Sequence, residues 1–221
     1  MQNNMSIRGV ITADIIDSTQ IPLKERQELI ESIMEVMDEL KKSIELEYEL
    51  YRGDSIQVVV ERPEKALLAA IAMRAGVKSR TPQGDSVLWD MRTSIGIGET
   101  EFISENIAVS DGEAFRFSGR GLDKIGKSTI SVLTPWDDVN KEFSVSVPFA
   151  DEIVRGWNEN QAAQVFLSLI HDKSRKDIAD QMGISAQAVS KTLISAKEKL
   201  IRNLISRFET VITGKTDSQC Q

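Results

Sequence analysis

Hydrophobic and polar positions alternate with two different periods along the first part of the chain. Residues 8–13 are short, mostly apolar and rich in β-formers, which predicts a buried strand ending at Asp14. After Pro22, apolar residues recur at steps of three and four as far as Ile44, which predicts an amphipathic helix. Residues 46–50 alternate between apolar and polar, and residues 56–60 are mostly apolar. With the short turn between them, the two segments predict a β-hairpin.

The same periods continue to about residue 133. We expect an alanine-rich helix over residues 63–78, a strand over 91–97, a helix over 112–124 and a strand over 129–133. The order strand, helix, strand, strand, helix, strand is typical of the ferredoxin-like (βαββαβ) arrangement. The fold class predicted for this part is therefore α+β.

The composition changes between residues 135 and 156, where Pro135, Pro148 and Gly156 occur. We expect an α+β domain over residues 1–140, a linker over 141–158 and a small all-α domain over 159–212. Residues 213–221 are expected to form a disordered tail.

The all-α part contains a candidate helix-turn-helix. Ser174 is placed to cap one helix, Gly183 to take a left-handed turn position, and Ser185 to cap a second helix that could continue to Phe208. A second helix that enters a DNA major groove needs short polar residues outward and cations near the phosphates. The expected DNA-binding residues are Arg175, Ser185, Gln187, Ser190, Lys191 and Lys197.

This stretch of about 50 residues resembles region 4 of sigma factors and the LuxR-type DNA readers. The resemblance implies DNA as a partner. The structural alternative is a helical hairpin that only packs or dimerises.

Composition limits the classes of protein. With 221 residues, 41% hydrophobic and 28% charged, the chain is of ordinary globular composition, and no apolar run approaches the length of a membrane span. One cysteine and one histidine exclude a disulfide within the chain and leave almost no ligands for structural zinc. We expect a cytoplasmic protein. Residues 1–150 carry a net charge of −8 and residues 151–221 one of +1, which suggests two units with different partners.

Two aspartates fall where phosphate chemistry would need them. Asp14 ends the first strand and Asp54 lies at the tip of the adjacent hairpin, so their carboxylates can approach each other. A Mg²⁺ or Mn²⁺ ion would relieve their repulsion. The backbone after Asp14 leads to a helix start, where free amides can hold phosphate. The alternative is a turn acid and a hairpin acid without metal.

Residues 13–19 and 52–55 resemble the two metal motifs of class III nucleotidyl cyclases, and residues 112–123 resemble the helix that carries the family's catalytic asparagine and arginine. The resemblance spans roughly residues 8–133. It implies that Asp14 and Asp54 bind the metal and that Arg120 stabilises charge on the transferring phosphate. The nucleotide or phosphate contacts expected with them are Ile15, Asp17, Ser18, Thr19 and Arg116.

Three positions depart from the family pattern. Arg116 stands at the asparagine position, and Leu50 and Val109 stand where the family reads the purine. The metal and phosphate end is thus matched, while the base and ribose end is not. A bound nucleotide or a different phosphorylated ligand is the expectation.

The pairing of the two units is similar to the SatD-type bacterial family. The favoured hypothesis is a homodimeric DNA-binding transcriptional regulator whose first domain binds a nucleotide or another phosphorylated ligand. The first alternative is a metal-dependent cyclase or related phosphoryl-transfer enzyme localised by its helix-turn-helix. The second is a module that binds only other proteins.

Overall fold

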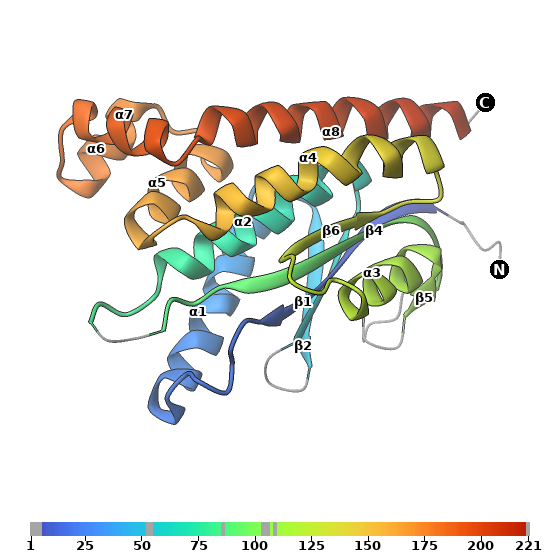
Figure 1. The fold of residues 1–221 in the computed structure, drawn as a ribbon, viewed down its shortest axis with the longest axis horizontal. Helices are drawn as coiled ribbons and strands as arrows, with labels where there is room; N and C mark the ends of the chain where they lie inside the picture. Colours follow the sequence, from blue (N-terminus) through green and yellow to red (C-terminus); the bar gives the residue numbers. More distant parts are fainter. Residues whose placement is uncertain (1–5, 52–54, 85–86, 103–106, 108–109, 220–221) are drawn as a thin grey trace.

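The computed structural model of the chain describes residues 6–51, 55–84, 87–102, 107 and 110–219. Over these residues the chain is a mixed α+β structure with one sheet of six strands and eight α-helices (Figure 1). The strands and helices predicted between residues 8 and 133 are all present, with boundaries shifted by a few residues. None of the helices in this described part combines the length and the apolar character that a membrane crossing requires.

The central strand of the sheet is β1 (Ser6–Ile15), which pairs antiparallel with both of its neighbours. In this register Asp14 lies between Ser55 and Arg92. A further strand, β6, pairs parallel with β4. The strands other than β1 are β2 (Leu46–Tyr51), β3 (Ser55–Val60), β4 (Met91–Phe102), β5 (Asp111–Gly112) and β6 (Ile130–Leu133).

Helices cover both faces of the sheet (Figure 1). Successive side chains of β1 point to opposite faces of the sheet. Ile11 belongs to the large core beneath α1 (Leu23–Lys41) and α2 (Ala66–Ser79). Val10 points to the other face and packs with Ala114 of α3 (Glu113–Asp123). Gly96 of β4 permits the close approach of α3, since a Cβ there would overlap the carbonyl oxygen of Ala114. Residues of β1 and β4 with even numbers therefore face α3.

The predicted linker over residues 141–158 is wrong for most of its length. The chain forms α4 (Asp137–Arg155), which contains Pro148 within the helix. Its apolar residues follow a helical period and are buried, which outweighs the proline: Val139, Phe143, Val147, Ala150 and Val154. α4 is thus part of the core.

The last part of the chain adds α5 (Glu159–Ile170), α6 (Arg175–Met182), α7 (Ala186–Ser195) and α8 (Glu198–Gln219). The single helix expected from Ser185 to Phe208 is interrupted, because Lys197 takes a left-handed conformation with φ of 57°. The disorder expected from residue 213 is wrong as far as Gln219, where α8 ends. Lys215 on this last stretch pairs with Asp138 of α4 at 2.7 Å.

One hydrophobic core contains residues from both predicted domains. Gly76 of α2 allows this, since a Cβ there would lie 2.6 Å from Val36 of α1 and 3.1 Å from Phe166 of α5. Helix α5 therefore packs closely on the helices that cover the sheet. The division into an α+β domain and an all-α domain remains a prediction.

A charged network is buried between the sheet, α2 and α4. Arg74 of α2 is fully buried and donates to both oxygens of Asp90 at 2.8 and 2.6 Å and to Asp151 of α4 at 3.1 Å. The carboxylate of Asp151 also accepts from the amide of Thr129 at 2.7 Å and from the hydroxyl of the same residue. Lys78 pairs with Asp90 at 3.0 Å, so two bases and two acids are brought together out of water.

We expect Arg74→Met to destabilise the fold by about 3–5 kcal/mol, because it leaves two buried carboxylates without their guanidinium partner. Urea unfolding followed by circular dichroism measures the loss. Arg207→Met is the matched control, since Arg207 pairs with Glu142 at the exposed surface, and it should leave the midpoint almost unchanged. Equal effects of the two variants would contradict a structural role for the network.

Candidate functional site

Asp14 lies one residue before the end of β1, on the face that carries α3. Its two carboxylate oxygens accept from the Arg92 guanidinium at 2.8 and 2.5 Å. The two residues are register partners on neighbouring strands, which fixes this bidentate geometry. The hydrogen bonds to Asp14 raise the pKa of Arg92 above its ordinary value, so the guanidinium stays charged.

The described residues do not fit a Mg²⁺ or Mn²⁺ site at this position. Both oxygens of Asp14 are already bonded to a cation, and a second cation there would be repelled by it. Asp54, the second expected ligand, lies outside the described residues. Within the described ranges no group of three or more potential ligands gathers around one point.

The turn after β1 differs from the expected helix start. Ile15 is buried, and the amide of Ile16 donates to the carbonyl of Asp90 at 3.0 Å instead of remaining free for phosphate. Asp17 has φ of 52°, and its carbonyl accepts from the amide of Gln20 at 2.8 Å. Helix α1 begins only at Leu23, so a turn that contains Ser18 and Thr19 separates the strand from the helix.

The two arginines of α3 are both exposed. Arg116 pairs with Asp111 at 3.1 Å. Neither Arg116 nor Arg120 is among the residues that line the cavity beside Asp17. The structure brings Asp14 and Asp17 close to Arg92, an arginine that the sequence did not single out.

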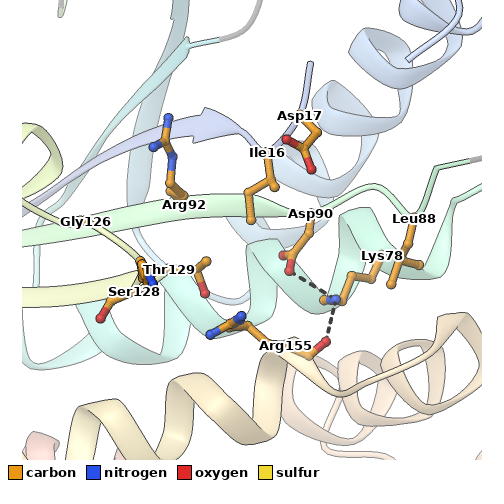
Figure 2. Close-up of a pocket in the computed structure, with 11 residues that line it drawn as sticks. Ile16, Asp17, Lys78, Leu88, Asp90, Arg92, Gly126, Ser128, Thr129 and Arg155 are labelled. Atoms are coloured by element: carbon orange, nitrogen blue, oxygen red, sulfur yellow. Dashed lines mark hydrogen bonds and ion pairs between the residues drawn. The ribbon is translucent and has the colours of Figure 1, made fainter. Parts of the chain in front are cut away.

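A cavity of about 450 Å³ opens where β1 ends and β4 begins. It is walled by the turn after β1, the ends of α2 and α4, the start of β4 and residues 126–129 before β6 (Figure 2). Its charged lining residues are Asp17, Lys78, Asp90, Arg92, Lys127 and Arg155. Four bases and two acids give this lining a net positive charge.

Lys78 is the most buried of these bases. Its ammonium pairs with Asp90 and donates to the carbonyls of Arg155 at 3.3 Å and Trp157 at 3.5 Å. Burial lowers the pKa of Lys78, and the nearby carboxylate of Asp90 partly offsets this. Figure 2 shows this ammonium between Asp90 and the carbonyl of Arg155. Lys78 therefore connects the end of α4, at the carbonyl of Arg155, to Asp90 in the cavity wall.

The loop from Gly126 to Thr129 was not identified from the sequence. A signal was available, because Gly121, Gly126, Lys127 and Ser128 match the spacing of a phosphate-binding P-loop. A P-loop follows a strand and opens a helix, whereas this loop follows α3 and leads into β6. It is therefore no P-loop, although it does reach a cavity lined by cations.

The expected DNA-binding residues lie on and around α6 and α7. Ser174 caps α6, Gly183 ends it with φ of 65°, and Ser185 caps α7, as expected from their positions. The hydroxyl and amide of Ser174 donate to Asp177, which lowers the pKa of that carboxyl.

On α7, Gln187 and Lys191 are exposed, while Ser190 is half-buried and accepts from Arg175 at 3.1 Å. Lys197 follows α7, where it lines a groove of about 300 Å³ with the exposed apolar residues Ile194 and Leu200. The expected set thus clusters at one end of the molecule, with Arg175 turned toward α7.

No protein-family model matches the chain, and no curated protein matches it either. Among solved structures, two of a bacterial light-regulated adenylyl cyclase match 60% of this chain at 12% identity, with TM-scores of 0.41 and 0.42. The match spans less than half of those chains, 44%. The guanylyl cyclase Cya2 matches 54% of this chain and 71% of its own at 15% identity, with a TM-score of 0.38. At these low values, function has to be argued from the residues themselves.

Proposed function

We propose that the α+β part of this chain binds a nucleotide or another phosphorylated ligand in the cavity at the end of β1. The observation that carries this proposal is the lining, which places Lys127 and Arg155 beside Arg92 and Lys78 around one hollow. Its volume of about 450 Å³ lies within the range of small-molecule sites. An excess of cations in a partly enclosed space favours an anionic ligand.

DNA binding by α6 and α7 is a second candidate function. It is supported by the capped turn at Gly183 and by a short helix that exposes Gln187 and Lys191. Together the two functions describe a transcriptional regulator that responds to a ligand. Such a ligand would alter DNA affinity only through different affinities for two conformations, and a homodimer would suit a two-fold DNA site.

A metal-dependent cyclase or phosphoryl-transfer enzyme is the alternative. The sequence motif around Asp14 supports it, whereas the bidentate pair with Arg92 opposes it, because that pair occupies the proposed ligand atoms. The described residues therefore favour a ligand that is bound without a metal ion on Asp14.

We expect one or more phosphorylated compounds to raise the melting temperature of the full chain without added metal. A ligand at 100 times its dissociation constant adds about 2.7 kcal/mol, which is roughly 5–10 °C for a chain of this size. A thermal-shift screen of nucleotides and sugar phosphates in EDTA measures the effect. If none of them raises the melting temperature, the proposed ligand function is wrong.

Lys191→Ala should weaken DNA binding and flatten its salt dependence, because one phosphate contact contributes roughly 0.9 to the logarithmic slope. Fluorescence anisotropy with a random-sequence DNA pool over a salt series measures both quantities. Lys24→Ala on α1 removes the same charge from another exposed site and serves as the control. Identical slopes for the two variants would exclude α7 as the DNA-contacting helix.

Asp14→Asn should destabilise the fold by about 1 kcal/mol, because it removes a partly exposed bidentate partner of Arg92. The loss should be the same in EDTA and in Mn²⁺, as measured by urea unfolding. A loss that occurs only with Mn²⁺, together with metal-dependent nucleotide turnover by the wild type, would instead establish Asp14 as a metal ligand.

A further inference from the structure

We infer that the phosphate group of the ligand is held at one end of the cavity by Lys127 and Ser128 of the loop between α3 and β6, together with Arg155 of α4. The inference rests on the proposed function and deepens it, since it names the phosphate-binding groups and the class of ligand. That class is the phosphate monoester of a small polyhydroxyl compound, such as a sugar phosphate.

The cations of the cavity differ in how completely they are already neutralised. Lys78 is fully enclosed by Asp90 and two carbonyl oxygens, and Arg92 is bonded twice to Asp14. Neither can turn to a ligand without giving up partners that are buried or held by strand register. The positive charge available to a ligand therefore comes from the remaining two bases.

Lys127 and Arg155 are those two bases. Lys127 is exposed, and no ion pair joins it to a residue in the part of the chain that the structure describes. Arg155 pairs with Glu152 at 3.5 Å, with 48% and 80% of the two side chains exposed, so solvent screens this pair and a phosphate can replace it. Figure 2 shows the Arg155 guanidinium extending to the side of the cavity on which Ser128 and Thr129 lie.

The third phosphate-binding group is the side-chain hydroxyl of Ser128, which the backbone of the loop places on the cavity wall. Gly126 has φ of 62°, and the turn it makes places Lys127 and Ser128 in succession on the cavity wall. Thr129 is excluded as a donor, because its amide and hydroxyl are bonded to Asp151. The Ser128 hydroxyl can thus donate to phosphate between the two bases.

The wall of the cavity opposite Lys127 and Arg155 indicates which chemical groups the rest of the ligand carries. Asp17 projects into the cavity from the turn after β1, where its carboxylate would repel a phosphate and accept hydrogen bonds from ligand hydroxyls (Figure 2). The described lining includes Ile16 and Leu88 but no aromatic ring on which a base could stack. A small polyhydroxyl compound with one phosphate matches this distribution.

Isothermal titration calorimetry of the full chain tests the inference with two separate probes, inorganic phosphate and ribose 5-phosphate. Lys127→Ala and Arg155→Ala should each weaken binding by about tenfold or more, because each removes a charge-assisted contact. Lys124→Ala is the matched control from the same loop, since Lys124 is exposed and does not line the cavity, and it should leave affinity unchanged. Asp17→Asn should strengthen phosphate binding several-fold, because it removes the carboxylate charge that repels phosphate. Asparagine tolerates the left-handed backbone conformation of this position, so the turn should be kept.

The outcomes separate this inference from the proposed function. If phosphorylated ligands bind but Lys127→Ala and Arg155→Ala behave as Lys124→Ala does, the phosphate lies elsewhere and only the inference fails. If neither probe binds and no nucleotide or sugar phosphate raises the melting temperature, both fail. Binding of ribose 5-phosphate alone, weakened by Lys127→Ala, would support the inference and identify the ester over free phosphate.

Discussion

The arrangement of this chain depends on the buried ion pairs that the guanidinium of Arg74 forms with Asp90 and Asp151. The guanidinium links Asp90, which precedes β4, to Asp151 of α4, and Asp151 in turn holds the amide of Thr129 ahead of β6. Removing four charged groups from water is costly unless each is paired, and here both carboxylates have several donors. The network therefore fixes three segments that meet at the cavity: the start of β4, the loop before β6 and the end of α4.

The same interactions join the cavity to the last helices of the chain. Lys78 donates to the carbonyls of Arg155 and Trp157, where α4 gives way to α5. The indole of Trp157 is buried and donates to the carbonyl of Ala196 at 2.8 Å, at the break between α7 and α8. A ligand that engaged Arg155 would act on a continuous set of buried contacts that ends beside α7. Such contacts transmit a signal only if the two ends have distinct arrangements that ligand and DNA bind unequally.

Local patterns predicted the local structure of this protein. The strand and helix periods before residue 133 and the caps at Ser174 and Ser185 depend on neighbouring residues, so they could be read along the chain. Helix α4 differs from the predicted linker because Pro148 and Gly156 are residues typical of linkers, whereas the buried apolar period of the segment stabilises a helix. The ordered end of α8 was missed because its stability comes from distant partners such as Asp138.

The candidate site was only partly predictable, for the same reason. The position of Asp14 near the end of β1 is predicted from the sequence, but its pairing with Arg92 depends on strand register across 78 positions. Lys127 and Arg155 come together only because α4 returns to the sheet. The most direct test is a crystal structure of the full chain grown with ribose 5-phosphate and Mn²⁺. We expect phosphate density between residues 126–128 and Arg155, with the Asp14–Arg92 pair intact. A metal ion on Asp14, with Arg92 displaced and the phosphate beside it, would contradict phosphate binding by Lys127, Ser128 and Arg155.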